Sequence, residues 1–307
     1  MVRPLSVLAI GVAIGATLGA QQTFRVGIDL VHFGVVVTDK QGAPITGLTS
    51  NDFEIIEEGR PQTVKFFAAG DPQSAPPLHL GVLLDTSGSM DRDIADVRTA
   101  AIKFLNAMME ASDVTLVDFD TEVRVARYGQ NDYPRLIERI RRRKPGGMTA
   151  LYDALGVYLN GAASQDGQKI LILYTDGGDT RSSLRLGDVL DLLKASDVTV
   201  YSIGYLEHQT SSVRNEARGQ LHHFASMTGG QSFFPVNTKE LDRLYENIRR
   251  EIAARYSLGY TSTDERADGA WRDVKIRLKR PDLKNVKLRT RSGYFAPYRE
   301  SAQRVKR

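Results

Sequence analysis

The chain has 307 residues, of which 41% are hydrophobic and 25% are charged. This composition is typical of a globular protein and leaves room for one domain of ordinary size with a smaller companion. The net charge of +4 is too small to indicate a nucleic-acid partner, and the absence of cysteine excludes disulfides, thiolate metal sites and cysteine nucleophiles.

The N-terminus has the features of a secretory signal peptide. Arg3 precedes an apolar run over residues 5–20 that ends in small residues, and the polar sequence QQTFR follows at once. We therefore predict a signal peptide over residues 1–20, cleaved after Ala20. The alternative is an uncleaved membrane anchor, although the run barely reaches the length that spans a bilayer. The mature protein is expected to be exported, as a periplasmic, extracellular or envelope-associated protein with no stable membrane span.

Residues 21–75 are predicted to form an N-terminal β segment that ends in a linker. Stretches rich in β-branched residues occupy residues 31–48, 52–59 and 61–67, and a turn at DKQGAP interrupts the first of them. The small, polar and proline-bearing sequence AAGDPQSAPP, residues 68–77, is typical of a linker.

Residues 76–253 show a different pattern, in which apolar strands alternate with amphipathic helices. The continuous apolar runs LHLGVLLD and KILILYTD are typical of strands that are covered on both faces. Apolar residues at helical spacing predict helices between the strands. This alternation favours an α/β fold with a doubly wound, mostly parallel sheet. The predicted strands are 78–85, 114–119, 122–128, 169–176, 198–205 and 231–236, and the predicted helices lie near 94–108, 136–140, 151–159, 189–193, 212–227 and 239–254.

Residues 254–296 return to a strand-like pattern in YSLGYTS, WRDVKIRLK and VKLRTRSGYFA. Because the two ends of a domain often lie close together, this C-terminal β segment could pair with the N-terminal one in a small antiparallel unit resembling a β-sandwich. The pattern does not decide whether such a unit packs on the α/β domain. The basic end, residues 297–307, is expected to be a loose tail.

Carboxylate and hydroxyl side chains occur where the predicted buried strands end. Asp85 ends one strand and is followed by Ser87 and Ser89, and Asp176 ends another. In an open α/β sheet, ligands bind beyond the carboxyl ends of the strands, where the strand order reverses. Thr149 follows two glycines that allow a loop to approach closely. Two carboxylates and three hydroxyls suit a hard divalent cation, Mg²⁺ first, with Mn²⁺ or Ca²⁺ as alternatives.

These segments resemble the metal-ion-dependent adhesion site of the von Willebrand factor type A domain. The resemblance rests on DTSGS at residues 85–89, on Thr149 in GGMT and on Asp176 in TDGGD. It covers residues 78–253, including the order and spacing of the strands. The flanking β segments resemble those of bacterial exported proteins that are built around such a domain.

The resemblance implies a binding function and no enzymatic activity. By analogy with the family, Ser87, Ser89 and Thr149 would contact the metal, and Asp85 and Asp176 would act directly or through water. The vacant position of the metal in this family typically accepts a carboxylate from a protein partner. The resemblance therefore implies an exported adhesion or protein-binding module.

Three other interpretations stay open. Ser89 or Asp91 could simply cap the helix that follows. An aspartate at the end of an apolar strand also occurs in Mg²⁺-dependent phosphotransferases and hydrolases, in which Asp85 would be the nucleophile. Their general acid lies two positions further on, where this chain has Ser87, and a hydroxyl cannot supply a proton near neutral pH as a tuned carboxylate can. The third interpretation is a structural envelope module whose metal site has no partner.

Several charged residues have a simpler expected role. Asp118 and Asp120 are expected in a solvated turn between two strands, and a place near the metal is the alternative. The basic run RIRRRK, residues 139–144, is expected to be a solvated helix face, although it could steer an acidic partner towards the cation. His222 and His223 are adjacent on a predicted helix and are expected to be structural.

Overall fold

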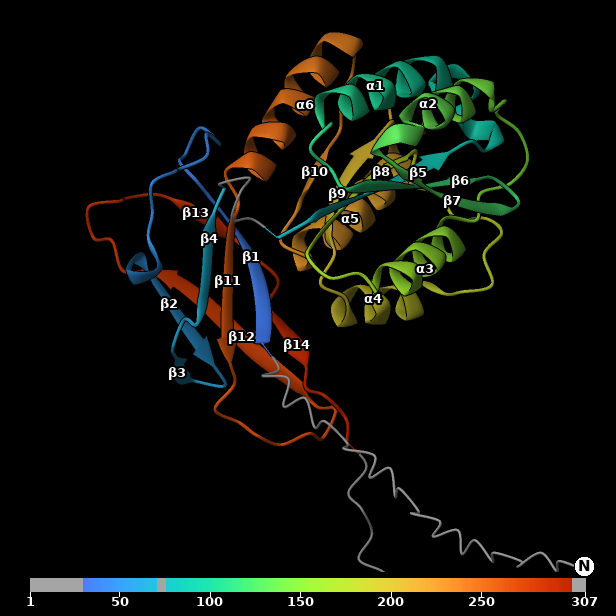
Figure 1. Cartoon of the computed structure of the whole chain (residues 1–307). Helices are drawn as coiled ribbons and strands as arrows, with labels where there is room; N and C mark the ends of the chain where they lie inside the picture. The colour runs from blue at the N-terminus through green and yellow to red at the C-terminus, as the bar shows by residue number, and fades with distance from the viewer. Residues whose placement is uncertain (1–29, 71–75, 300–307) are drawn as a thin grey trace, which may run out of the picture.

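The computed structural model describes residues 30–70 and 76–299, which form two units (Figure 1). One is an α/β unit in the middle of the chain, and the other is a β-sandwich to which both ends contribute. The predicted signal peptide, residues 71–75 of the linker and residues 300–307 of the basic tail lie outside the described residues, so the expectations for them stay predictions.

The α/β unit is organised around one six-stranded sheet with the strand order β10-β9-β8-β5-β6-β7. All neighbouring strands are parallel except β6 and β7, which pair antiparallel. The predicted fold class is therefore confirmed. The strands of this sheet are β5 (Leu78–Asp85), β6 (Asp113–Phe119), β7 (Val123–Gly129), β8 (Gln168–Thr175), β9 (Thr199–Gly204) and β10 (Gln231–Phe233).

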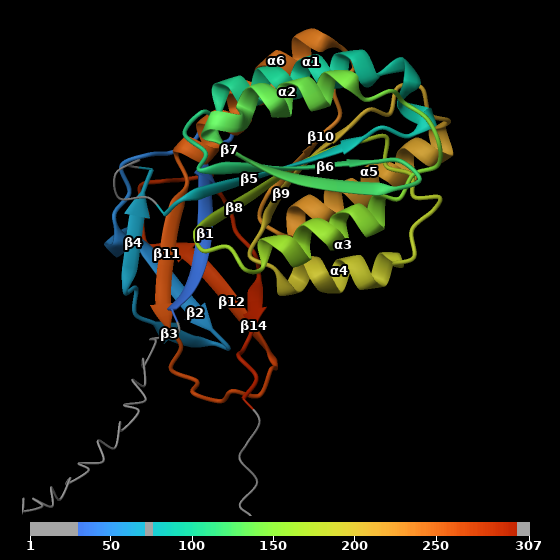
Figure 2. The same cartoon turned by 45° about the vertical axis from the view of Figure 1, so that its right-hand side comes forward.

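Helices cover both faces of the sheet, which is why β5 and β8 read as continuous apolar runs (Figure 2). α1, α2 and α6 pack on one face, and α3, α4 and α5 pack on the other. The helices are α1 (Ile94–Ala107), α2 (Tyr133–Arg142), α3 (Leu151–Ala162), α4 (Leu186–Ala195), α5 (Ser211–Met227) and α6 (Thr238–Ala253). Short 3-10 turns lie at Gly88–Arg92 and Gln130–Asp132 in this unit and at Ser50–Asp52 in the β-sandwich.

The β-sandwich consists of two four-stranded sheets with the orders β13-β1-β11-β4 and β14-β12-β2-β3. Each sheet joins strands from both ends of the chain, since β1 pairs antiparallel with β11 and β2 with β12. A single apolar core lies between the two sheets. The strands are β1 (Leu30–Thr38), β2 (Phe53–Glu57), β3 (Arg60–Gln62), β4 (Phe66–Ala69), β11 (Tyr256–Thr261), β12 (Trp271–Leu278), β13 (Lys287–Arg289) and β14 (Gly293–Phe295).

Two stretches that were expected to be single strands each divide between the two sheets. Residues 61–67 separate into β3 and β4, and residues 286–296 separate into β13 and β14. The stretch after the DKQGAP turn forms only an isolated bridge between Thr38 and Pro44, because proline has no backbone N–H to continue a ladder. A sandwich needs such corners, at which the chain passes from one sheet to the other.

The β-sandwich packs against the end of the α/β unit at which the parallel strands begin (Figure 1). Arg291 donates a hydrogen bond to the carbonyl oxygen of Ser196 in the α/β unit, at 3.2 Å, and another to that of His32 within the sandwich, at 2.8 Å. Arg255, which is buried, donates to the hydroxyl of Thr199 at 2.5 Å. The carboxyl ends of the strands, where the metal site is expected, therefore lie at the edge away from the sandwich.

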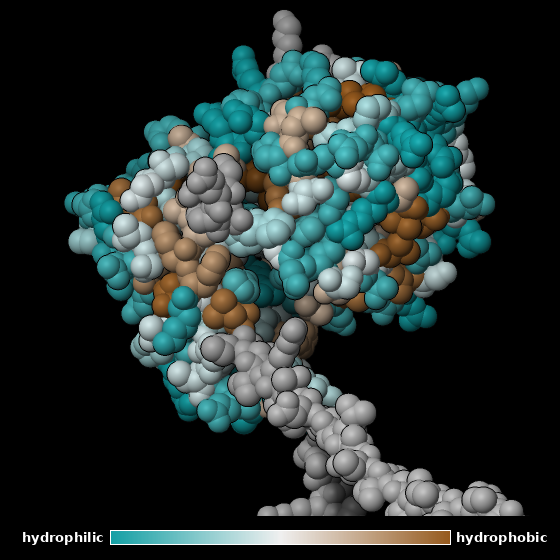
Figure 3. Space-filling model, viewed as in Figure 1, coloured by the Kyte–Doolittle hydropathy of each residue, from teal (hydrophilic) through white to brown (hydrophobic). Residues whose placement is uncertain are grey.

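The surface in Figure 3 is mainly hydrophilic over the α/β unit, with apolar side chains in small separate groups. None of the helices in the described part of the chain combines the length and hydropathy needed to cross a lipid bilayer.

Candidate metal centre

The candidate site lies at the point where the sheet changes its winding direction. β5 is hydrogen-bonded to β6 on one side and to β8 on the other. After β5 the chain continues to β6 on one side of the sheet, and after β8 it continues to β9 on the opposite side, so a crevice opens between the ends of β5 and β8. Asp85 ends β5 and Asp176 directly follows β8, so both residues lie at the crevice in which α/β sheets bind ligands.

The carboxylate of Asp85 is fully buried and held by two hydrogen bonds. Its Oδ1 accepts from the backbone N–H of Ser87 at 2.9 Å, and its Oδ2 accepts from the hydroxyl of Thr175 at 2.7 Å. Burial raises the pKa of Asp85 to about 7, and the negative charge of Asp176 adds to this effect.

The two serines of the DTSGS stretch lie side by side. The Oγ atoms of Ser87 and Ser89 are 3.1 Å apart, and Ser87 is buried whereas Ser89 is exposed. The loop is joined to the loop that contains Thr149, since Gly88 N donates to the carbonyl of Gly147 at 3.1 Å. A Cβ on Gly88 would lie 3.3 Å from that oxygen, so glycine allows this close approach.

Thr149 and Asp176 are held by a third loop and by a segment that follows β9. The backbone N–H of Thr149 donates to the hydroxyl of Thr180 at 2.9 Å, and its carbonyl accepts from the N–H groups of Thr180 and Arg181. Asp176 is buried, and its Oδ2 accepts from the side-chain amide of Gln209 at 2.8 Å. The structure therefore places all five expected ligands at one edge, on loops that are bonded to one another.

Helix capping does not account for these residues. The 3-10 turn that starts at Gly88 and helix α1, which starts at Ile94, both begin without a side-chain cap. Neither Ser89 nor Asp91 acts as the helix cap that the simpler interpretation requires.

The chemistry of the donor set fits a hard divalent cation. A cation placed between Asp85 and Asp176 would neutralise two adjacent negative charges in a buried setting, and the three hydroxyls are oxygen donors of the kind that Mg²⁺ accepts. The described residues contain no group of three or more histidine, cysteine, aspartate or glutamate side chains that could hold a metal.

Thr175 and Gln209 were not singled out from the sequence, although each bonds a carboxylate of the site. Thr175 could have been found, because it is the last residue of a buried strand next to Asp176. Gln209 gives no sequence signal, because it reaches Asp176 only through the fold.

The expectation for Asp118 was wrong. This side chain is fully buried and forms ion pairs with Arg124, Arg139 and Arg143, at 2.7, 2.6 and 2.6 Å. The strand pairing explains the difference, because Asp118 lies opposite Arg124 in the antiparallel pair of β6 and β7. Its partners come from β7, α2 and the residue after α2, so no local pattern reveals its burial.

The fold and the donor set define an α/β domain with a candidate cation site at the carboxyl edge of its sheet. The family model of the von Willebrand factor type A domain matches residues 79–247, and the chain belongs to this family. A comparison with curated protein sequences gives no match.

Several solved structures are similar in fold. The PilB minor pilin from Streptococcus sanguinis is 16% identical with a TM-score of 0.48, and the match covers 59% of this chain and 62% of that one. The vWF domain of the type V pili tip protein Mfa5 from Porphyromonas gingivalis is 14% identical with a TM-score of 0.46, covering 57% and 95%. A von Willebrand factor type A protein from Catenulispora acidiphila is 13% identical with a TM-score of 0.47, covering 88% and 74%.

Proposed function

We propose that this chain is an exported, metal-dependent protein-binding module of the adhesion type. The observation that supports the proposal is that the segments containing Asp85, Ser87, Ser89, Thr149 and Asp176 lie at one edge of the sheet, on loops that hydrogen bonds join. Export rests on the predicted signal peptide, and the binding mode rests on the resemblance of the motif to a metal-ion-dependent adhesion site.

Each residue has a distinct role in the proposal. Ser87, Ser89 and Thr149 would contact a divalent cation, Mg²⁺ or alternatively Mn²⁺ or Ca²⁺, and Asp85 and Asp176 would act directly or through water. When bound, the cation supplies a Lewis-acidic position that can accept a carboxylate oxygen of a partner protein. Our assignment includes no catalytic residue.

A single carboxylate on a metal gives modest affinity, so the surface around the site must contribute to binding. Met148, next to Thr149, is 50% exposed, and Ser89 is exposed as well. An apolar side chain beside an open polar edge can pack on a partner that the cation holds.

The phosphotransferase alternative has less support. The residue two positions after Asp85 is Ser87, which is buried against Ser89 and has no acidic proton to give to a leaving group. A magnesium-dependent turnover of generic phosphate esters that is lost in Asp85→Asn would nevertheless favour the enzyme over our proposal.

Calorimetric titration of the purified protein with Mg²⁺, Mn²⁺ and Ca²⁺ tests the metal site. We expect Thr149→Ala and Asp85→Ala to weaken binding strongly, whereas Thr99→Ala, on the exposed face of α1, should bind like the wild type. Equal metal affinities for the wild type and all three variants would contradict the assignment of the site. A pull-down from envelope extracts, with and without chelator, then tests adhesion, because identical partner sets in the two conditions would indicate a structural role.

A further inference from the structure

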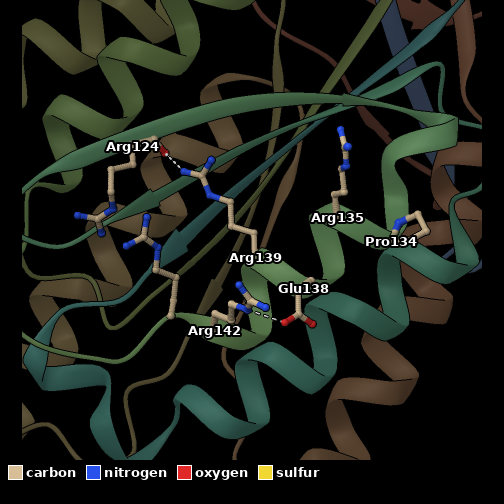
Figure 4. A pocket seen from close by; sticks show the side chains of 7 residues that line it. Arg124, Pro134, Arg135, Glu138, Arg139 and Arg142 are labelled. Atoms are coloured by element: carbon tan, nitrogen blue, oxygen red, sulfur yellow. Dashed lines mark hydrogen bonds and ion pairs between the residues drawn. The ribbon is translucent and has the colours of Figure 1, made fainter.

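A shallow cleft lined by arginines lies beside the candidate metal edge (Figure 4). Arg124 comes from β7, Arg135, Arg139 and Arg142 come from α2, and Arg143 directly follows α2. In Figure 4, the guanidinium of Arg139 reaches the backbone carbonyl oxygen of Arg124, to which it donates at 3.3 Å, and Arg142 pairs with Glu138 on the same helix.

The inner arginines of this cleft are held in place. Asp118 is fully buried and pairs with three guanidinium groups, and Asp120 accepts a second ion pair from Arg124 at 2.6 Å. Asp118 and Asp120 thus fix Arg124, Arg139 and Arg143. With the exposed Glu122, 3.6 Å from Arg124, three carboxylates balance these arginines, so the excess positive charge of the cleft comes from its rim. A guanidinium that is already fixed loses little side-chain freedom when it binds a further anion.

The rim of the cleft carries an excess of positive charge. Apart from the inner Arg139 and Arg143, residues 132–144 contain four basic side chains, Arg135, Arg141, Arg142 and Lys144, and two acidic ones, Asp132 and Glu138. Arg135 and Arg142 are 83% and 79% exposed, so their side chains are accessible to a partner. This excess of cations on one helix repels itself, which gives an anionic occupant a direct electrostatic benefit.

Hydrogen bonds link the cleft to the metal edge. Nη2 of Arg124 lies 3.5 Å from the hydroxyl of Thr86, the residue between Asp85 and Ser87. The carbonyl of Thr86 accepts from Gly146 N at 2.9 Å, in the loop that leads from α2 to Thr149. A partner that reaches the metal edge therefore also faces the arginines.

We propose that the arginine cleft is a second subsite that binds an acidic polypeptide segment of the partner whose carboxylate the cation holds. This inference rests on the proposed function and names the chemistry of its partner. Planar guanidinium groups bind carboxylates in a bidentate manner, and Arg124 already holds the two oxygens of Asp120 in this way. The exposed apolar side chain of Met148, next to Thr149 at the metal edge, favours a polypeptide over a lipid headgroup or a free phosphate.

The test uses a fluorescein-labelled hexaglutamate peptide and fluorescence anisotropy, with Mg²⁺ and with chelator, at constant ionic strength. Arg135→Gln with Arg142→Gln should weaken binding about fivefold, because surface charge pairs contribute modestly. Glu138→Gln should strengthen it about twofold, because it removes the acidic residue that competes for Arg142. Hexaglutamine should not bind.

The matched control is Arg249→Gln with Arg250→Gln, which removes the same charge from exposed positions on α6, on the same face of the sheet. Equal losses of hexaglutamate affinity in both double variants would mean that the peptide is attracted non-specifically, and this would overturn the inference. Binding to inorganic phosphate or to anionic phosphatidylglycerol vesicles, without binding to hexaglutamate, would overturn it as well. Calorimetry with Mg²⁺ separates the two proposals. If the protein binds Mg²⁺ but Arg135→Gln with Arg142→Gln leaves hexaglutamate affinity unchanged, only the cleft is refuted. If the protein does not bind Mg²⁺, the proposed function is refuted.

Discussion

The hydroxyl of Thr175, on β8, donates a hydrogen bond of 2.7 Å to Oδ2 of Asp85, at the end of the neighbouring strand β5. The same oxygen of Thr175 accepts from the N–H of Gly177 at 3.0 Å. One buried hydroxyl thus fixes both the first carboxylate of the site and the loop that begins with Asp176.

Thr175→Val keeps the shape of this side chain but removes the hydroxyl. We expect the metal-free protein to lose about 1–3 kcal/mol of stability, because a buried carboxylate oxygen loses its donor. Chemical denaturation measures this change, and calorimetry should show metal affinity about tenfold weaker. Thr115→Val, at a partly buried position on β6, is the control, and an equal effect of both substitutions would contradict the role of Thr175.

Gln209→Leu tests whether the segment after β9 positions Asp176. Loss of the amide that donates to Asp176 should weaken metal binding about tenfold and leave the melting temperature close to that of the wild type. Gln220→Leu removes a similar amide, which donates to Tyr152 at 2.7 Å, and should bind metal normally. Unchanged metal affinity in Gln209→Leu would show that this contact has no role in the site.

Asp118→Ala should be the most destabilising of these substitutions. It leaves three guanidinium groups without the buried carboxylate that they share, and breaking a buried ion pair in this way costs about 3–5 kcal/mol. Denaturant titration followed by circular dichroism measures the loss. Asp132→Ala removes a half-exposed partner of Arg135 and should change stability little, by about 0.5 kcal/mol or less.

Trp271, the single tryptophan of the chain, reports on the contact between the two units. Nζ of Lys194, on α4, lies 4.4 Å from the centre of its ring. Lys194→Met should change the emission of Trp271 and cost about 0.5–1 kcal/mol, since it removes a cation–π contact. Lys103→Met, at an exposed position on α1, should do neither. Superimposable emission spectra of wild type and Lys194→Met would mean that the units do not meet at this point in solution.

The stability of the α/β unit should depend on the protonation of Asp113. Burial tends to raise the pKa of Asp113, but hydrogen bonds from Arg127 and His79 outweigh it and lower the pKa below the usual 3.8. The carboxylate therefore stabilises the folded state above pH 3.8, and this stabilisation is lost as the pH falls through the folded-state pKa. Denaturation from pH 7 to pH 2 should show Asp113→Asn less stable than the wild type, with the difference shrinking at the acid end.

Much of the α/β unit could be predicted from the sequence, because its signals are local. A strand covered on both faces is a continuous apolar run, and a helix on a sheet repeats its apolar residues every three to four positions, as residues 78–85 and 94–108 do. The corners of the β-sandwich could not be predicted in this way. Both parts of residues 286–296 look like one strand, and only the positions of β1 and β12 assign β13 and β14 to different sheets.

The sequence by itself determined the type of the α/β unit and the kinds of side chain at its strand ends, because periodicity and the placement of Asp85, Ser87 and Ser89 are properties of short stretches. Only the tertiary structure decided which distant groups meet them. The bond between Thr175 and Asp85 joins residues 90 positions apart, and the burial of Asp118 depends on arginines from β7 and α2. The protonation and energetics of a buried carboxylate are set by such neighbours, which chain folding brings together and local pattern does not encode.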